Sequence, residues 1–271
     1  MLIVSLIIGF ILLLAVFLVA CIAGREKNPD ADKFMKARYA HRGLHGGTDR
    51  PENSLAAFSA AVDKGYGIEL DVHLMNDGRL AVIHDSSLKR TAGEDVRIEK
   101  LTSADLDNYR LEGTDQKIPT FKEVLETVDG KVPLLIELKA AGNVKPLCSA
   151  LWNELNGYKG DWCIESFDPR CVLWFKKNQP EVVRGQLSQN FLKQNENLKF
   201  PLRLILSLLS FNIVTQPDFV AFKFADRKFI SNLLSRSFWN MKGFAWTIKS
   251  EEDIKTAENE GYAVIFEDFE P

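Results

Sequence analysis

The stretch GIELDV at residues 67–72 decides the fold that we expect for this chain. Side chains on a β-strand point alternately to its two faces, so Glu69 and Asp71 share one face and three aliphatic residues share the other. If the aliphatic face packs on surrounding helices, both carboxylates point into the interior of a barrel. They repel each other there unless a cation lies between them. The stretch therefore predicts an inward-facing acidic strand beside a bound metal ion.

Further β-rich segments alternate with helical patterns along the chain. Together with the acidic strand there are eight, at residues 37–41, 68–74, 132–139, 162–167, 182–187, 219–224, 243–248 and 263–267. Such alternation is typical of α/β folds with a parallel sheet. A doubly wound open sheet shares it. The count of eight favours closure into a (β/α)8 TIM barrel. One polar insertion, at about 86–117, interrupts the alternation and is expected to form a small subdomain over the barrel mouth.

A second strand repeats the acidic pattern. In LLIELK, residues 134–139, Glu137 and Lys139 share a face opposite three aliphatic residues. A third carboxylate therefore points inward beside Glu69 and Asp71. Three oxygen ligands without a cysteine favour one hard divalent cation, Mg²⁺ or Ca²⁺, over Zn²⁺.

A hairpin is expected to follow the first acidic strand, because Asp77-Gly78 is a strong two-residue turn signal. A two-residue turn pairs Asp71 with His84 across the hairpin. His84 is therefore expected beside the carboxylates, where it would act in catalysis. His73 shares the face of Asp71, but at the end of its strand it is expected at the rim.

Five motifs carry a resemblance to a known family: His-Arg-Gly at 41–43, Pro-Glu-Asn at 51–53, Glu-Leu-Asp-Val at 69–72, Val-Ile-His-Asp at 82–85 and Ile-Glu-Leu-Lys at 136–139. In this order and spacing the chain resembles the glycerophosphodiester phosphodiesterases, as a membrane-anchored, bacterial-type member. The resemblance covers residues 37–271, with later matches at 165–168 and 245–248.

The resemblance implies metal-dependent hydrolysis of glycerophosphodiesters to sn-glycerol 3-phosphate and an alcohol. It also implies the site residues: His41 and His84 as the acid–base pair, Glu69, Asp71 and Glu137 as metal ligands, Arg42 and Lys139 facing the phosphate, Glu52 supporting the first histidine and arginine, and Trp246 lining the substrate pocket. Glu165 departs from the family pattern, which has a small or apolar residue there, and is expected to affect substrate fit. His45 is expected in an exposed loop.

The amino terminus predicts a membrane anchor. Residues 2–23 contain no charge and no proline, and a membrane-spanning helix needs about 20 apolar residues. We expect an anchor at 1–23, a linker at 24–36 and the barrel domain at 37–271. A cleaved signal peptide starts with positive charge, which is absent between Met1 and Leu2.

The basic residues after this span, Arg25, Lys27, Lys33 and Lys36, place the barrel domain in the cytoplasm, because such residues favour the inner face of a membrane. An alternative arises from Leu18-Val19-Ala20-Cys21, which resembles a lipobox. In that case the domain would be extracytoplasmic and lipid-anchored at Cys21.

Composition limits the partners and leaves two rival functions. A net charge of -3 over 271 residues argues against nucleic acid, because nucleic-acid binders need clustered Lys and Arg. One rival is lysophospholipase D activity on membrane lysophospholipids, with the apolar segment 201–211 dipping into the interface. For that segment a buried barrel helix is favoured. The other rival is a membrane scaffold that has lost its chemistry.

Overall fold

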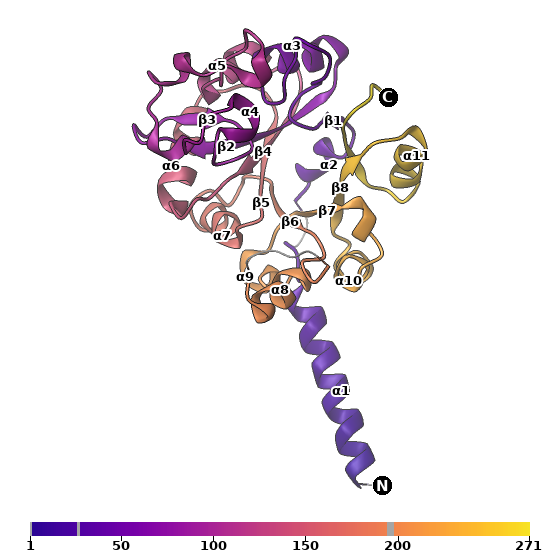
Figure 1. Cartoon of the computed structure of the whole chain (residues 1–271). Coiled ribbons are helices and arrows are strands. Elements are labelled where there is room, and N and C mark those ends of the chain that lie inside the picture. The colour runs from indigo at the N-terminus through magenta and orange to yellow at the C-terminus, as the bar shows by residue number, and fades with distance from the viewer. Residues whose placement is uncertain (1, 26–27, 194–197) are drawn as a thin grey trace.

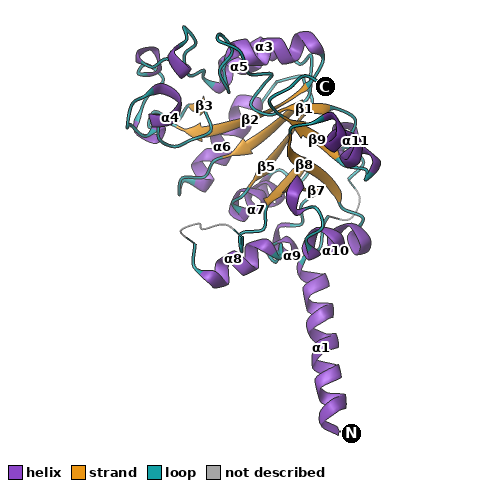
Figure 2. Ribbon diagram, turned by 45° about the vertical axis from the view of Figure 1, so that its right-hand side comes forward, coloured by secondary structure: helices purple, strands orange, loops and turns teal. Residues whose placement is uncertain are grey.

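We describe the chain from a computed structural model, which covers residues 2–25, 28–193 and 198–271. One long helix, α1 (Leu2–Cys21), projects from the remaining elements, as Figure 1 shows. The rest of the described chain forms a sheet surrounded by helices, with the carboxyl terminus beside β1 in this view. Strands lie inside and helices outside in Figure 2 as well.

Eight parallel strands close into a barrel in the described part of the chain. Each strand pairs with the next in the order β1-β9-β8-β7-β6-β5-β4-β2, and β1 also pairs with β2. This last pairing closes the ring and excludes the open doubly wound sheet, so the TIM-barrel prediction is confirmed. The strands are β1 (Arg38–Ala40), β2 (Gly67–Leu74), β4 (Leu134–Leu138), β5 (Trp162–Ser166), β6 (Arg184–Ser188), β7 (Phe219–Lys223), β8 (Lys242–Ile248) and β9 (Ala263–Phe266).

Helices cover the outside of the barrel, and alternation along the strands divides the core into two layers. Ile68, Leu70 and Val72 of β2 belong to the layer between the strands and the helices. Tyr39, Leu135 and the other residues of the second layer fill the barrel. The helices are α2 (Ala31–Phe34), α3 (Leu55–Lys64), α4 (Lys89–Ala92), α5 (Phe121–Val128), α6 (Val144–Leu155), α7 (Pro169–Asn178), α8 (Phe200–Ser207), α9 (Asn212–Thr215), α10 (Ile230–Trp239) and α11 (Glu251–Asn259).

The hairpin after β2 has a different register from the one expected. Strand β3 (Leu80–Val82) pairs antiparallel with β2, and the amide of Met75 donates to the carbonyl of Arg79 at 2.9 Å. Three residues therefore form the turn, with Gly78 at a φ of 81°. The amide of Ile83 donates to the carbonyl of Asp71 at 3.1 Å. The predicted pairing of Asp71 with His84 is wrong by one residue, because Asn76 joins the turn.

The insertion after the hairpin has a small core of its own. It contains α4 and three short 3₁₀ segments, η1 (Ile98–Lys100), η2 (Leu106–Asn108) and η3 (Leu111–Gly113). Its apolar side chains pack on Ile83 and on the strands of the hairpin. The hairpin therefore carries the insertion, and Arg90 and Glu99 extend from it toward the site described below.

The segment expected as a linker is partly folded against the barrel. Phe34 of α2 is only 1% exposed and belongs to the interior layer of the barrel. The hydroxyl of Tyr39 donates to the carbonyl of Phe34 at 3.0 Å. An aromatic side chain that closes the amino-terminal end of the barrel explains why this short segment is ordered. Lys27, one of the predicted basic flanking residues, lies outside the described residues.

Two apolar segments expose their side chains on the surface of the described chain. Residues Ile3–Cys21 form a helix long and apolar enough to cross a membrane, a property that both anchors and signal sequences share. The expectation of a buried barrel helix at 201–211 is wrong. Leu202, Leu204, Ile205 and Phe211 are all exposed, because α8 lies on the outer surface beside α9.

Candidate active site

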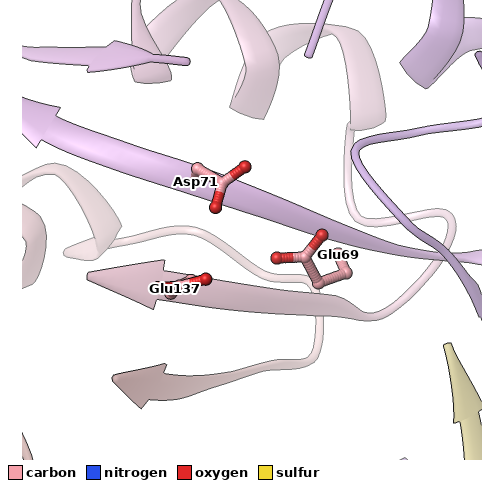
Figure 3. A group of neighbouring side chains, drawn as sticks. All are labelled: Glu69, Asp71 and Glu137. Carbon is pink, nitrogen blue, oxygen red and sulfur yellow. The ribbon is translucent and has the colours of Figure 1, made fainter. Parts of the chain in front are cut away.

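Three carboxylates meet inside the barrel, as the sequence pattern predicts. Glu69 and Asp71 extend from β2 and Glu137 extends from the neighbouring β4 (Figure 3). Asp71 and Glu137 are partners in the register of these strands. One oxygen from each of the three side chains lies within 4.8 Å of the others, and all three residues are buried. This spacing allows one ion to contact all three carboxylates.

Two cations partly balance this negative charge. Nζ of Lys139 lies 3.0 Å from Oδ1 of Asp71 and 2.8 Å from Oε1 of Glu137. Nε of Arg42 lies 3.6 Å from Oδ2 of Asp71. Burial by itself raises the pKa of Asp71, but Lys139 and its cationic neighbours outweigh that effect and hold this pKa below its ordinary value. Asp71 is therefore ionised.

The other two carboxylates bind protons more tightly than usual. Burial raises the pKa of Glu69 well above its ordinary value, and the charges of Asp71 and Glu137 raise it further. Burial also raises the pKa of Glu137 to about 7, although Lys139 opposes the effect. Excess negative charge in a dry site is the condition that a bound cation relieves. The three side chains therefore fit a divalent metal ion.

Glu165 adds a fourth acidic group that sequence reasoning assigned only to substrate fit. It is 1% exposed and pairs with Glu137 in the register of β5 and β4. Burial raises its pKa well above the ordinary value, followed by the charges of Glu69 and Glu137. Its Oε2 atom has no hydrogen-bond partner among the described residues. The alternation of Cys163 and Glu165 with Ile164 was a signal for this inward position.

His41 follows β1 and enters the same site. Its Nδ1 atom lies 3.1 Å from Oε1 of Glu267, at the end of β9. Its Nε2 atom lies 3.8 Å from Oε2 of Glu69. Burial lowers the pKa of His41, and the contact with Glu267 offsets part of this shift. The imidazole is thus fixed between the acidic end of β9 and the carboxylate group.

His84 approaches from the end of the hairpin. Its Nδ1 atom lies 2.7 Å from Oδ1 of Asp85, and Arg90 donates to the other oxygen of Asp85 at 2.5 Å. Burial lowers the pKa of His84, and the positive charge of Lys139 contributes to the same effect. The expectation that His73 lies at the rim is wrong: it is buried, and its Nε2 atom contacts the carbonyl of His84 at 3.1 Å. His73 therefore holds the backbone of His84.

The loop after β1 places Arg42 against the site. Its amide donates to Oε2 of Glu69 at 3.0 Å, and its guanidinium donates to both oxygens of Glu52 at 3.0 Å. Glu52 also accepts from Arg90 of the insertion, at 2.9 and 2.6 Å. Asn53 donates to Oδ2 of Asp71 at 2.9 Å. Glu52 therefore contacts two arginines, while Asn53, which sequence reasoning missed, orients Asp71.

His45 differs from its predicted exposure. Its side chain is 17% exposed, and Nε2 lies 3.4 Å from Oε1 of Glu267. The same oxygen contacts His41. Nζ of Lys249 lies 2.9 Å from the other oxygen. His45 is therefore half-buried, and it shares Glu267 with His41.

A cavity of about 110 Å³ lies at the centre of these groups, at the carboxyl ends of the strands. One wall contains Trp246, whose ring meets Phe167 edge to face at 5.8 Å between centroids. The Trp246 Nε1 atom is buried without a partner among the described residues, so it is available to a ligand. The lining comprises His41, Arg42, Glu69, His84, Glu137, Glu165, Phe167, Leu187, Trp246, Thr247 and Ile265.

Comparison with known proteins agrees with this arrangement. The model of the glycerophosphoryl diester phosphodiesterase family matches residues 41–270, most of the barrel. A phosphodiesterase of Oleispira antarctica, solved in complex with the product sn-glycerol-3-phosphate, shares the fold with a TM-score of 0.69 at 24% identity, over 87% of this chain and 94% of that one. A glycerophosphodiester phosphodiesterase of Thermotoga maritima aligns with a TM-score of 0.64 at 27% identity, over 85% of this chain and 93% of that one.

Two curated relatives match a shorter stretch. The glycerophosphodiester phosphodiesterase of Bacillus altitudinis is 40% identical over 117 residues, which cover 41% of this chain and 47% of that protein. Lysophospholipase D GDPD1 of Rattus norvegicus is 35% identical over 125 residues, 41% of this chain and 39% of that protein. The chain thus spans less than half the length of these relatives. The match of the family model over the barrel is decisive, and the chain belongs to the glycerophosphoryl diester phosphodiesterase family.

Proposed function

We propose that this protein hydrolyses glycerophosphodiesters to sn-glycerol 3-phosphate and an alcohol, with a divalent metal ion. One observation supports this most strongly. Two histidines, each with Nδ1 against a carboxylate, line a cavity beside three convergent carboxylates, two of which, Glu69 and Glu137, also line it. Hydrolysis of a phosphodiester requires neutralised phosphoryl oxygens and two proton transfers, and these groups can provide both.

Glu69, Asp71 and Glu137 would hold the metal. Carboxylate oxygens suit a hard ion, so we propose Mg²⁺ or Ca²⁺. When bound, the ion supplies positive charge that stabilises the phosphoryl oxygens. Arg42 and Lys139 extend the positive charge around the cavity and would face the phosphate. Glu52 orients Arg42, because both of its carboxylate oxygens accept hydrogen bonds from the guanidinium.

His41 and His84 would be the catalytic residues that transfer protons. A carboxylate at Nδ1 favours the tautomer with its proton on Nδ1, which leaves Nε2 able to accept a proton. One histidine takes the proton of the attacking water or of a neighbouring substrate hydroxyl. The other donates a proton to the alcohol oxygen as its bond to phosphorus breaks. Trp246 would contact the glycerol, since its ring forms an apolar wall of the cavity.

The direct test is hydrolysis of a panel of glycerophosphodiesters by the purified full chain. We expect release of sn-glycerol 3-phosphate when Mg²⁺ or Ca²⁺ is present. Glu137→Gln keeps the shape of the side chain but removes a ligand charge, and it should lose most of the activity. Glu126→Gln, at an exposed position on α5, is the matched control. Absence of turnover on every diester with either metal would refute the proposal.

A second candidate is removal of the head group from lysophospholipids, the activity named for the rat relative. The observation that favours it is a large apolar cavity beside the barrel mouth. A membrane scaffold without chemistry has less support, because the carboxylates and both histidines converge on one cavity.

We also propose that α1 anchors the protein in the cell membrane and that the barrel lies in the cytoplasm. The apolar length of α1 supports the anchor, and the basic residues Arg25, Lys33 and Lys36 that follow it support the side. A lipid-anchored, extracytoplasmic form with modified Cys21 is the alternative. The domain boundaries at residues 1–23, 24–36 and 37–271 belong to the same proposal.

A further inference from the structure

A second cavity lies beside the first, at the same end of the barrel. It encloses about 790 Å³ between α7, α8 and α9, a volume in the range of ligand pockets. Leu173 of α7, Leu202 and Leu206 of α8 and Phe211 supply much of its apolar lining. Its charged lining residues in the described chain, Asp168 and Arg170, are paired with each other at 2.6 Å. The lining therefore suits an uncharged, flexible hydrocarbon.

Aromatic side chains connect this cavity to the catalytic one. Phe167 lines both cavities. Its ring meets Trp246 on the catalytic side at 5.8 Å and Phe191 on the apolar side at 6.1 Å, edge to face in both cases. These three rings form a continuous apolar path from the glycerol end of the catalytic cavity to the space between α7 and α8.

Helices α8 and α9, which supply part of the lining of the apolar cavity, lie on the side of the molecule from which α1 emerges. Helices α8, α9 and α10 surround the carboxyl end of α1 in both views (Figures 1 and 2). The indole of Trp239 on α10 donates to the carbonyl of Val19 in α1 at 2.8 Å. Outside α1, the exposed large apolar side chains of the described chain lie in this region: Leu192, Phe200, Leu202, Leu204, Ile205, Phe211, Ile213, Val214, Ile230, Leu233, Phe238 and Trp239.

Resting on the function proposed above, we propose that the cavity between α7 and α8 binds the single acyl chain of a membrane lysophospholipid. The phosphodiester then lies in the catalytic cavity, and the glycerol lies near Trp246. The apolar face around α1 rests on the lipid surface, so the acyl chain passes from the bilayer into the cavity without crossing water.

The reaction keeps the acyl chain intact. Water supplies the new oxygen on phosphorus, the bond between phosphorus and the head-group oxygen breaks, and a proton moves to the released alcohol. The product is an acylated glycerol phosphate. This is the chemistry proposed for the soluble diesters, so the acyl cavity determines substrate choice and adds no new step.

The cavity fits a hydrocarbon better than a segment of protein. A peptide backbone needs partners for its amides and carbonyls, and polar groups of the lining are already engaged. The hydroxyl of Thr215 donates to the carbonyl of Phe211, and Asp168 is bound to Arg170. An acyl chain needs only apolar contact. Each methylene that it buries increases the binding affinity about fourfold.

The test compares lysophosphatidylethanolamines of increasing acyl length with deacylated glycerophosphoethanolamine, using the full chain at one detergent concentration. We expect kcat/KM to rise with chain length. Leu206→Gln should make this rise less steep, and its kcat/KM for the palmitoyl substrate should fall at least tenfold below that of the wild type. Glu126→Gln on α5, a residue outside both cavities and outside the apolar face around α1, should keep the wild-type slope. Substrate partition into detergent is equal for all three proteins, so a difference in slope arises from the cavity.

A photoreactive group at the end of the acyl chain gives a second readout. It requires neither turnover nor a variant that folds correctly. In the wild-type chain it should label peptides of α7 and α8, as located by mass spectrometry. Labelling confined to α1, equal slopes for Leu206→Gln and Glu126→Gln, or a crosslink between two copies through α8 would each overturn the acyl site. If α7 and α8 are labelled but no diester is hydrolysed, deacylated ones included, the proposed hydrolase activity is refuted and the acyl site is not.

Discussion

His41 and Glu267 stand 226 positions apart in the sequence, yet Nδ1 of the histidine lies 3.1 Å from Oε1 of the glutamate. The second histidine has an equivalent neighbour, because Nδ1 of His84 lies 2.7 Å from Asp85. Closure of the barrel brings β1 beside β9 and creates the first pair, whereas the second is local. Each imidazole therefore has one nitrogen fixed and the other available for proton transfer.

Replacing Glu267 should shift the pH dependence of the reaction. The contact with Glu267 raises the pKa of His41 against the lowering effect of burial. In Glu267→Gln this support is lost, so the pKa of His41 falls further. The limb of the pH–rate profile that reports His41 should move to lower pH, whichever proton His41 transfers. Turnover should fall by less than the roughly 10²–10⁴-fold expected for removal of an acid or base itself. Glu270→Gln, whose carboxylate pairs with Lys64 at the surface and not with either histidine in the described chain, should leave the profile unchanged.

Metal removal should abolish activity and lower stability together. Glu69, Asp71 and Glu137 repel one another without a cation, and a ligand that binds only the folded state raises its stability. Chelation should therefore stop hydrolysis and lower Tm, and Mg²⁺ or Ca²⁺ should restore both. Differential scanning fluorimetry and the hydrolysis assay, run on the same samples, check this. Full activity in thoroughly chelated protein would contradict it.

Metal affinity should fall as the pH is lowered. Without metal, Glu137 has a pKa of about 7 and Glu69 a pKa well above its ordinary value. A ligand carboxyl must lose its proton before it binds the ion, so protons compete with the metal below neutral pH. Calorimetric titrations in buffers of different ionisation enthalpy should reveal proton release on binding. A constant affinity from pH 8 to pH 6, without proton release, would exclude these side chains as ligands.

Local patterns explain what the sequence could predict. The period of two in β2 and β4 orients Glu69, Asp71 and Glu137 without any knowledge of the rest of the chain. All eight parallel strands were predictable for a similar reason, because each lies in a short β-rich run between helical patterns. The start of α3 has a local cause too, because the side chain of Ser54 accepts from the amide of Ala57, and serine is a preferred residue at this position.

Contacts that depend on tertiary closure were not predictable. Glu267 meets His41 only because β9 pairs with β1, and Arg90 reaches Glu52 only through the folded insertion. The predicted register of the hairpin was wrong for a different reason. Asp77-Gly78 marks the turn, but no local signal shows that Asn76 joins it, and one extra residue shifts every pair. His84 still reaches the cavity because it lies beyond the end of β3.

The side of the membrane can be tested with one introduced cysteine. The native cysteines, Cys21, Cys148, Cys163 and Cys171, are all buried, so a thiol probe needs a new site. Glu94→Cys places one on the exposed surface of the insertion. A membrane-impermeant maleimide should miss this residue in intact cells and label it after lysis, if the barrel faces the cytoplasm. Labelling before lysis would instead favour the extracytoplasmic, lipid-anchored form.

Removing either of the two histidines proposed to transfer protons should have similar consequences on natural diesters. His41→Ala and His84→Ala should each lower turnover by about 10²–10⁴-fold, the usual contribution of a positioned acid or base. Metal binding should persist, because the three carboxylates remain.

A p-nitrophenyl ester of glycerol phosphate separates the roles of the two histidines, since its leaving group needs no proton. The variant without the general acid should recover on that substrate, and the variant without the base should not. His45→Ala, which loses only a neighbour of Glu267, should be affected far less than either. Near-normal rates of both His41→Ala and His84→Ala on glycerophosphodiesters would place the chemistry elsewhere.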